Sequence, residues 1–436
     1  MNKTIQKADR LEGSVVLPGD KSISQRAILL NSISDGQAHI SNLCEGDDRT
    51  SILTCMRGLS VEITEHSNCN VSGAKECFLV NGRGLNGLTE PSEVLNAGNS
   101  GTASRLVTGL LSGQSFFSTI TGDESLRARP MKRIVQPLSQ MGAQINGRDN
   151  GNLLPLSITG GNLEGIRFKQ PVPSAQVKSS LLVAGLYAEG STYIIQPSLS
   201  RDHTELMLKA MGANIQVNGL EIEIQKSNLN PVDISVPGDI SSSAFWLVAG
   251  CIHPNAKILI KSVGINPTRS GILEIIMAMG GRLTIQNERI EQSELVADIS
   301  AESSSLEATE ISGDIIPRII DELPILAVAA SQAKGTTVVK DATELRVKES
   351  DRISATVSGL RQLGADIQEK PDGMIINGDN VLTGNSVKSY GDHRIAMSMA
   401  IAGLISEGKT VISGAESAAI SYPLFWDTID SISPSL

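Results

Sequence analysis

Aromatic residues are scarce in this chain, and their scarcity restricts what can fill its core. Phe, Trp and Tyr together make up 3% of the 436 residues, although 40% of the residues are hydrophobic. The core must therefore be packed by aliphatic side chains and methionine. No apolar run approaches the roughly 20 residues of a membrane-spanning helix. The N-terminal MNKTIQKADR also lacks the apolar stretch of a secretion signal. These absences predict a cytoplasmic protein.

An excess of basic residues is also lacking. The 37 Lys and Arg residues stand against 47 Asp and Glu residues, so the formal net charge is −10. This balance argues against general binding to nucleic acid or to a membrane surface. It leaves a small anionic ligand possible, because a local cluster of cations can dominate one site.

Cysteine and histidine are too few and too scattered to suggest a metal centre or a disulfide framework. The chain has five of each, with no CxxC spacing and no clustered histidines. We interpret the cysteines as small, buried and reduced residues. They are Cys44, Cys55, Cys69, Cys77 and Cys251.

What the chain has in abundance is a repeated unit. A stretch of small and apolar residues, typical of a buried helix, is followed by a Gly-containing turn and a β-branched run. A second, amphipathic helix then ends in a phrase such as QMGAQI at Gln140 or QLGADI at Gln362. The six copies open at Ile23, Gly101, Val177, Ser241, Leu323 and Arg394. Such self-similarity dictates the architecture and predicts an α/β protein with buried helices inside a shell of sheets and outer helices.

Two matching turns suggest how the six copies are divided. LPGDKS at Leu17 and VPGDIS at Val236 both place Pro-Gly-Asp before a buried helix. Pro-Gly favours a turn and Asp caps a helix, so both segments are interpreted as crossings between domains. The prediction is a discontinuous domain of residues 1–20 and 239–436, holding copies four to six plus an N-terminal strand, and an inserted domain of residues 21–238 holding copies one to three.

Polar and charged residues gather where the buried helices begin. A helix N-terminus offers free N–H groups and a partial positive charge, which suit an anion. Capped helices with solvated charges are the alternative interpretation of each cluster taken singly. The clusters are GDKSISQR from Gly19, NAGNSGTASR from Asn96, SLRARPMKR from Ser125, PSAQVKSS from Pro173, SRDH from Ser200, LRVKESDR from Leu345 and YGDHR from Tyr390.

Three further interpretations concern particular side chains. A helix through LRVKESDR would bring Lys348, Glu349 and Arg352 together by their spacing. Asp321, at the start of an apolar helix, is a candidate base. His203, alone in a loop before an amphipathic helix, is interpreted as a surface residue.

At these clusters the chain resembles the enolpyruvyl transferases. GDKSISQR, GNSGT, RPM, SAQVKS, RDHTE, RVKESDR and GDHRIAM correspond to family segments, in order, over nearly the whole chain. The patterns DKS-x-S-x-R and RVKE-[ST]-DR are specific to this family. The resemblance implies two inside-out α/β domains, each of three βαβαββ-type repeats, with the active site in the interdomain cleft.

The resemblance also implies an activity. The enolpyruvyl group of phosphoenolpyruvate would pass to the 5-hydroxyl of shikimate 3-phosphate, and phosphate would leave a tetrahedral intermediate. This is a step in aromatic amino acid biosynthesis, inhibited in this family by glyphosate. It needs no metal or organic cofactor. The expected partners are the two anionic substrates alone, without nucleic acid or membrane, and the chain is expected to be a monomer.

Site residues follow from the resemblance position by position. The implied catalytic residues are Lys21, Asp321 and Glu349. The implied ligands of shikimate 3-phosphate are Lys21, Ser22, Arg26, Ser174, Ala175, Gln176, Arg201, Asp321 and Lys348. The implied ligands of phosphoenolpyruvate are Lys21, Gly101, Arg129, Gln176, Arg352 and Arg394.

The sequence departs from one branch of the family at two positions. That branch has Lys where Ile420 stands and Asn where Glu344 stands, so neither contact is carried over. Ala175 and Arg201 match a second branch, whose members often tolerate glyphosate. Gly101 keeps the residue whose change to Ala is linked to tolerance, and we expect the chain to be sensitive.

Two other functions were weighed. The sister transferase that acts on UDP-N-acetylglucosamine usually has a reactive Cys five residues before Arg-Pro, where this chain has Glu124. A non-catalytic repeat scaffold would vary its exposed residues, whereas this chain repeats basic residues at helix entries. Both alternatives are therefore disfavoured.

Overall fold

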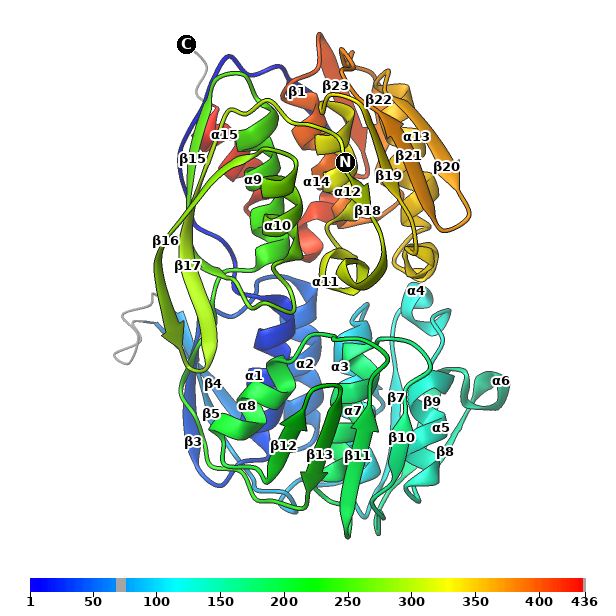
Figure 1. Cartoon of the computed structure of the whole chain (residues 1–436). Helices are drawn as coiled ribbons and strands as arrows, with labels where there is room; N and C mark the ends of the chain where they lie inside the picture. The colour runs from blue at the N-terminus through cyan, green and yellow to red at the C-terminus, as the bar shows by residue number, and fades with distance from the viewer. Residues whose placement is uncertain (68–75, 434–436) are drawn as a thin grey trace. The chain divides into compact units, whose positions relative to one another are not determined.

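The computed structural model describes residues 1–67 and 76–433, whose contacts divide the chain into two compact units. Unit 1 comprises Met1–Pro18, Pro237–Ile290 and Leu295–Leu436. Unit 2 comprises Gly19–Val236 and the short segment Glu291–Glu294. Each unit contains both helices and strands, so the predicted α/β class is confirmed (Figure 1).

Unit 2 contains three repeats, each with one sheet. Its first repeat consists of α1 (Lys21–Ser32), β3 (Gln37–Ser41), α2 (Asp47–Gly58), β4 (Glu62–Ser67), β5 (Glu76–Asn81) and β14 (Ile234–Ser235). The second consists of β6 (Leu95–Asn96), α3 (Gly101–Ser112), β7 (Phe117–Thr121), α4 (Glu124–Arg127), α5 (Lys132–Gln140), β8 (Gln144–Gly147), α6 (Arg148–Gly151) and β9 (Leu153–Thr159). The third consists of β10 (Arg167–Lys169), α7 (Ala175–Gly185), β11 (Ser191–Ile195), α8 (His203–Ala210), β12 (Ile215–Asn218) and β13 (Glu221–Gln225).

Unit 1 repeats the same plan. Its first repeat consists of β2 (Leu11–Val15), α9 (Ile240–Ile252), β15 (Ala256–Gly264), α10 (Gly271–Ala278), β16 (Arg282–Glu291) and β17 (Glu294–Glu302). The next consists of β18 (Glu310–Ile311), η1 (Gly313–Ile315), α11 (Ile316–Ile319), α12 (Leu323–Ser331), β19 (Thr336–Val339), η2 (Thr343–Val347), α13 (Arg352–Gln362), β20 (Asp366–Lys370) and β21 (Gly373–Asn377). The last consists of β22 (Ser386–Lys388), α14 (His393–Gly403), β23 (Lys409–Ser413), η3 (Ala415–Ile420), α15 (Phe425–Ile432) and β1 (Asn2–Gln6).

The sheets share one topology. In β6-β7-β9-β8 the first two strands are parallel and the other neighbours are antiparallel, and β10-β11-β13-β12 and β18-β19-β21-β20 follow the same order. A parallel pair needs a crossover, and the buried helix supplies it where the two strands are near in sequence, as α3 does between β6 and β7. The last sheet, β1-β23-β22, has three strands.

Two sheets take their first strand from a distant part of the chain. β14 pairs in parallel with β3, placing Ile234 opposite Ile40. β2 pairs in parallel with β15, placing Leu11 opposite Ala256. β2, near the N-terminus, therefore completes a repeat of unit 1. β14, next to the second Pro-Gly-Asp turn, completes a repeat of unit 2.

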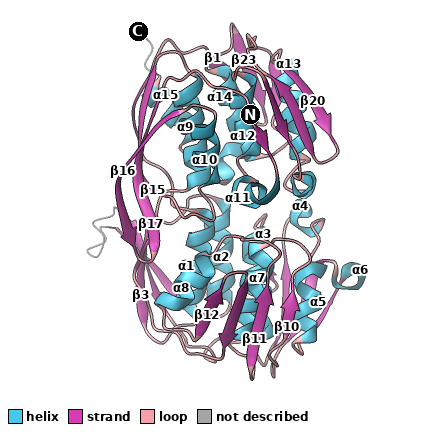
Figure 2. Ribbon diagram, viewed as in Figure 1, coloured by secondary structure: helices cyan, strands magenta, loops and turns pink. Residues whose placement is uncertain are grey.

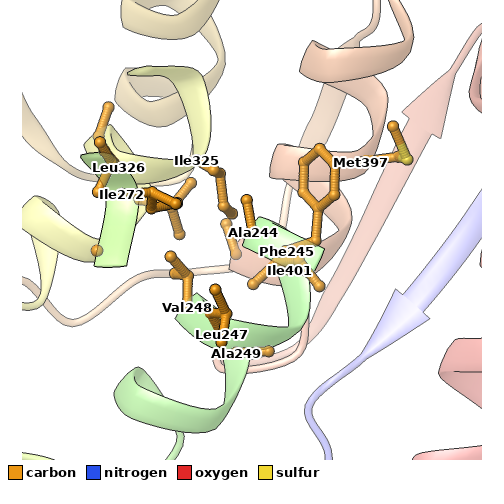
Figure 3. Packing of buried hydrophobic residues seen from close by; sticks show 14 of the residues in the cluster. Ala244, Phe245, Leu247, Val248, Ala249, Ile272, Ile325, Leu326, Met397 and Ile401 are labelled. Atoms are coloured by element: carbon orange, nitrogen blue, oxygen red, sulfur yellow. The ribbon is translucent and has the colours of Figure 1, made fainter. Parts of the chain in front are cut away.

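The first helix of each repeat is buried nearly all round, with sheets and second helices outside it (Figure 2). α3 and α7 pack so closely that a Cβ on Gly109 would overlap the Ser180 carbonyl. In unit 1 the side chains of α9, α10, α12 and α14 meet in one cluster (Figure 3). Leu247, Ile272, Ile325 and Met397 belong to this cluster, whose members are mainly aliphatic.

Leu247→Ala is expected to destabilise unit 1 by about 2–5 kcal/mol, because a fully buried leucine leaves a cavity. Trp246 and Trp426, the chain's two tryptophans, both lie in unit 1 and report its unfolding in urea by fluorescence. Leu424→Ala is the matched control, since Leu424 lies in the same unit and is 52% exposed. Equal losses in the two variants would contradict the packing described.

Candidate active site

In unit 2 the N-termini of three buried helices are joined by side-chain hydrogen bonds. Gln25 of α1 donates from Nε2 to Ser100 Oγ at 3.0 Å, and Ser100 is the residue that caps α3. Gln176 of α7 donates from Nε2 to Thr102 Oγ1 of α3 at 2.7 Å. Each helix begins with N–H groups that have no partner within the helix. Three such ends in contact produce a region of positive potential.

Arg26 ties α1 to α7 and α8. Its guanidinium donates to Ser179 Oγ at 2.8 Å, to Thr204 Oγ1 at 2.6 Å and to the Ser22 carbonyl at 2.9 Å. The side chain is buried, and burial lowers the pKa of Arg26 to about 10, although the charge of Glu205 opposes this shift. Arg26 therefore stays protonated at neutral pH and holds the helix ends in place.

Two further cations lie at the start of α1. The Lys21 ammonium is 3.1 Å from Asp48 Oδ2, and 24% of the Lys21 side chain is exposed. Arg201 donates from Nη1 to Ser22 Oγ at 3.4 Å. Lys21, Ser22, Arg26 and Arg201, which the sequence placed in one site, thus lie close together in unit 2.

Gly101 lies against two guanidinium groups. Arg105 donates from Nη1 to the Gly101 carbonyl at 3.0 Å, and Arg129 donates from Nη2 to Asn99 Oδ1 at 2.7 Å. A Cβ on Gly101 would stand 2.7 Å from Arg105 Nη1 and 3.5 Å from Arg129 Nη1. Any larger residue would displace the Arg105 guanidinium and would bring its Cβ into van der Waals contact with Arg129.

The start of α7 separates polar groups with different roles. Ser174 caps the helix, accepting from the Val177 amide at 3.4 Å, and Ala175 follows as its first residue. Lys178, by contrast, is completely buried, with its ammonium 2.6 Å from Glu205 Oε1. Burial raises the pKa of Glu205, and Lys178 opposes the rise. Lys178 is therefore part of the interior of unit 2.

Unit 1 joins its three buried helices in the same way. Ser241 of α9 donates from Oγ to Glu322 Oε1, and Glu322 is the residue before α12. Arg394 of α14 donates from Nη1 to the Ser241 carbonyl at 3.1 Å. Asp392 caps α14 by accepting from the Arg394 amide at 2.9 Å. The residues before these helices are acidic, so this junction needs cations.

Arg352 supplies the central cation. It donates to Asp392 Oδ2 at 2.8 Å, to Asp321 Oδ1 at 3.0 Å and to Glu349 Oε2 at 2.6 Å. The Lys348 ammonium is 3.4 Å from Asp321 Oδ1. Burial lowers the pKa of Arg352, but the three carboxylates outweigh burial and leave this pKa above its usual value. Burial raises the pKa of Asp392, yet Arg352 and His393 outweigh it, and the net shift is downward.

The predicted helix through Lys348 and Glu349 is wrong. α13 begins only at Arg352, because the Asp351 carboxylate caps it by accepting from the Ser354 amide at 3.1 Å. Lys348 and Glu349 lie in the loop before the cap. Ion pairs with Asp321 and Arg352, and not helical spacing, bring the group together.

The surface interpretation of His203 is also wrong. His203 is buried, and its Nδ1 lies 2.7 Å from Glu294 Oε1. Glu294 lies 91 residues further along the chain, so a local sequence pattern could not reveal the pair.

The cysteines in the described residues are buried, as predicted: Cys44, Cys55, Cys77 and Cys251. Cys69 lies outside the described residues. Burial raises the pKa of Cys44 and that of Cys55 to about 12, so these thiols stay protonated and unreactive at neutral pH.

Over the part of the chain that the structure describes, no group of three or more His, Cys, Asp or Glu residues is arranged to hold a metal ion. No helix among residues 1–67 and 76–433 is long and apolar enough to cross a membrane.

Sequence reasoning missed three residues of the unit 1 junction. Asp239 and Asp392 each directly precede a buried helix, as Asp20 does, and this position was their only signal. Arg269, in the turn between β15 and α10, belongs to no repeated pattern. It lies 3.4 Å from Asp239 Oδ1 and 4.0 Å from Asp321 Oδ2.

Known proteins resemble the chain over nearly its full length. A sequence profile described as EPSP synthase (3-phosphoshikimate 1-carboxyvinyltransferase) matches residues 5–429. The 3-phosphoshikimate 1-carboxyvinyltransferase of Synechococcus elongatus is 52% identical, over 97% of this chain and 94% of that protein.

Solved structures agree with these matches. An EPSP synthase structure from Acinetobacter baumannii has a TM-score of 0.88 and 41% identity, over 99% of this chain and 98% of that one. The enolpyruvyl transferase NikO from Streptomyces tendae has a TM-score of 0.79 over 98% of this chain and 96% of its own, at 16% identity, and shares the fold.

Arg352→Met is expected to destabilise unit 1, because it leaves Asp392 buried without its main counter-charge. The expected cost at pH 8 is about 3–5 kcal/mol of unfolding free energy. In the parent the pKa of Asp392 is depressed, so its stabilising effect is complete above pH ~4 and fades only as the pH falls further. In the variant burial dominates and raises this pKa, so stability is lost as the pH rises above ~4.

The cost should therefore be smaller at pH 5 than at pH 8, as measured by urea unfolding followed by tryptophan fluorescence. Arg282→Met is the control, since the Arg282 side chain is 66% exposed and pairs with Glu302 on the surface of the same unit. Its expected cost is below ~1 kcal/mol at both pH values. A cost for Arg352→Met that does not change with pH would contradict this account.

Proposed function

Because the chain belongs to the EPSP synthase (3-phosphoshikimate 1-carboxyvinyltransferase) family, we propose that it transfers the enolpyruvyl group of phosphoenolpyruvate to the 5-hydroxyl of shikimate 3-phosphate, releasing phosphate. The observation that carries the proposal is the pair of helix-end junctions. The residues that match the family's motifs gather at one such junction in each unit, with Lys21 and Arg26 in one and Asp321 and Arg352 in the other.

Unit 2 supplies most of the anion binding in this proposal. Shikimate 3-phosphate is held by Lys21, Ser22, Arg26, Ser174, Ala175, Gln176 and Arg201, with Asp321 and Lys348 of unit 1 on its hydroxyls. Cations and helix N-termini suit its phosphate, since both offer N–H donors and positive charge. Arg26, whose donors already contact three protein oxygens, contributes mainly by keeping Ser22 and α7 in place.

Phosphoenolpyruvate carries a carboxylate and a phosphate, and the proposed ligands divide between the units. They are Lys21, Gly101, Arg129 and Gln176 of unit 2 and Arg352 and Arg394 of unit 1. Planar guanidinium groups suit both anions, because each can donate two parallel hydrogen bonds. The short Gly101 leaves room beside Arg129 for a bound anion.

The chemistry then needs two proton transfers and one leaving group. The 5-hydroxyl oxygen attacks C2 of phosphoenolpyruvate and loses its proton, while C3 gains a proton, so a tetrahedral adduct forms. C3 next returns a proton as the C2–O bond to phosphate breaks, which restores the double bond and releases phosphate. Fixed cations stabilise the charge that develops on the leaving group.

Two carboxylates fit the proton transfers. We assign Asp321 to the proton of the 5-hydroxyl and Glu349 to the proton at C3, with Lys21 and Lys348 assisting. Arg352 contacts both carboxylates, at 3.0 Å and 2.6 Å, and holds each in one orientation. An ionised Asp321 accepts the proton of the 5-hydroxyl, whereas a protonated Glu349 gives its proton to C3 and, once ionised, accepts the proton that C3 returns.

The proposal includes the setting of the reaction. The chain is expected to act as a cytoplasmic monomer in the pathway to aromatic amino acids, without metal or organic cofactor. Its reaction requires only the two anionic substrates.

The direct test is phosphate release that depends on both substrates. Lys21→Met and Glu349→Gln should each reduce kcat by at least ~10²-fold, the usual contribution of a positioned acid or base. Both variants should still fold, as shown by a cooperative urea unfolding transition. Lys257→Met and Glu302→Gln are matched controls on the surface of unit 1 and should keep parental turnover.

Two outcomes would overturn these assignments. Phosphate release without shikimate 3-phosphate, or turnover of UDP-N-acetylglucosamine in its place, would refute the proposed reaction. Near-normal kcat in both Lys21→Met and Glu349→Gln would refute the roles given to these side chains while leaving the reaction intact.

Gly101→Ala is expected to weaken inhibition by glyphosate, to which we expect the parent to be sensitive. The new methyl group would displace the Arg105 guanidinium and fill the space beside Arg129. The half-inhibitory glyphosate concentration should rise by at least ~10-fold, the effect of about 1.4 kcal/mol. The KM for phosphoenolpyruvate should rise less, and that for shikimate 3-phosphate should stay unchanged. Equal inhibition of parent and variant would contradict the placement of Gly101.

A further inference from the structure

A buried arginine that the proposed mechanism does not use lies behind Asp321. Arg269 is 3% exposed and belongs to a turn whose backbone is fixed by a hydrogen bond from the Arg269 amide to the Asn266 carbonyl at 2.8 Å. Burying a guanidinium group costs free energy, because it loses its hydrogen bonds to water. Polar partners in the protein must replace them.

The first set of partners belongs to the start of α9. Arg269 donates from Nη2 to Ser241 Oγ at 2.7 Å and lies 3.4 Å from Asp239 Oδ1. The Ser241 carbonyl in turn accepts from Arg394 at 3.1 Å. Arg269 therefore holds Ser241 in place, and Ser241 is the hydrogen-bond partner of Arg394, a proposed ligand of phosphoenolpyruvate.

The second set belongs to the start of α12. Arg269 Nη1 is 3.8 Å from Glu322 Oε1 and 4.0 Å from Asp321 Oδ2. Arg352 and Lys348 hold the other oxygen of Asp321, at 3.0 Å and 3.4 Å. Asp321 thus has cations near both oxygens, with Arg352 and Lys348 near Oδ1 and Arg269 near Oδ2.

Glu322 completes the arrangement. It is fully buried and accepts a short hydrogen bond from Ser241 Oγ, the same hydroxyl that Arg269 contacts. A buried ion pair seldom stabilises a protein more than apolar residues of equal size would. The pair of Arg269 and Glu322 is therefore better explained by the geometry it imposes than by the stability it adds.

We propose that Arg269 and Glu322 form a positioning pair for the reaction. Arg269 sets the orientation of Asp321 and, through Ser241, that of Arg394, while Glu322 balances its charge and fixes the Ser241 hydroxyl. The inference rests on the proposed role of Asp321 as the base.

The first experiment compares steady-state kinetics of Arg269→Met and Arg269→Lys with the parent. Loss of the guanidinium should lower kcat by about 10²-fold in Arg269→Met, the effect of a small misplacement of a reacting group. The KM for shikimate 3-phosphate should change much less than kcat, because most of its proposed ligands belong to unit 2 and are untouched. Arg269→Lys keeps the positive charge but loses the forked geometry of the guanidinium. Its kcat should lie between that of the parent and that of Arg269→Met.

The pH profile separates positioning by charge from support of the fold. The charged groups facing Asp321 are Arg269, Arg352 and Lys348. Removing one of them favours the protonated carboxylate, so the acidic limb of the kcat–pH profile should move to higher pH in Arg269→Met. It should stay in place in Arg269→Lys.

A double variant separates activity from stability. Arg269→Met leaves Glu322 buried without its cation and should lower the urea midpoint. Adding Glu322→Gln removes that charge yet keeps an acceptor for Ser241, so stability should largely return. Turnover should stay low, because Asp321 still lacks its contact with Arg269. Arg282→Met, on a 66% exposed arginine of the same unit, is the control and should match the parent in both measurements.

Recovery of kcat together with stability in the double variant would overturn the inference, since it would make Arg269 a structural residue only. Parental kcat and pH profile in Arg269→Met would overturn it as well. A parent without phosphate release dependent on both substrates would instead refute the proposed function, so the two failures are distinguishable.

Discussion

The need to satisfy the N-termini of buried helices governs both units of this protein. Each first helix of a repeat is buried nearly all round, so its leading N–H groups cannot rely on bulk water. In each unit the N-termini of three buried helices lie together, and polar side chains between them supply hydrogen-bond partners. Gln25 and Gln176 serve in one unit, and Ser241 and Arg394 serve in the other. A requirement of the backbone thus creates a place where charged residues can be held.

The two junctions differ in charge because their caps differ. Of the three buried helices in unit 2, α3 and α7 are capped by serines, Ser100 and Ser174, and α1 is capped by Asp20. The caps at this junction carry fewer negative charges than those in unit 1, which suits the binding of anions. In unit 1 all three helices follow an acidic residue, and buried arginines offset the negative charge. A junction with balanced charges and several carboxylates suits the transfer of protons.

The sequence was sufficient for the fold class and for most of the candidate residues. Runs such as SLLVAGL from Ser180 and the recurring MGA phrases predict buried and outer helices, and α7 and α5 confirm two of these predictions. Lys21 and Asp321 were found because they stand where buried helices begin. These signals are local, and they repeat six times along the chain.

Contacts between distant segments were not predictable in this way. Arg269 meets Asp321 across 52 residues of chain, and neither its neighbours nor its spacing mark it. His203 lies in a stretch that resembles a surface loop, and only its contact with Glu294 explains its burial. The loop before Arg352 resembles a helix by charge spacing, but the cap at Asp351 decides where that helix begins. Tertiary contacts overrode the local pattern in each case.

The exchange of first strands has a consequence for synthesis on the ribosome. β14 completes the β3 sheet of unit 2 once residue 235 has been made. Nearly all residues of unit 2 are therefore synthesised before most residues of unit 1. β1 and β2 are made before the rest of unit 1, yet β2 must wait for β15, and β1 must wait for β23, where Asn2 pairs with Ser413. These two strands are therefore among the last parts of unit 1 to find their place. Until then they have unsatisfied edges, and their short length and polar residues limit mispairing with other chains.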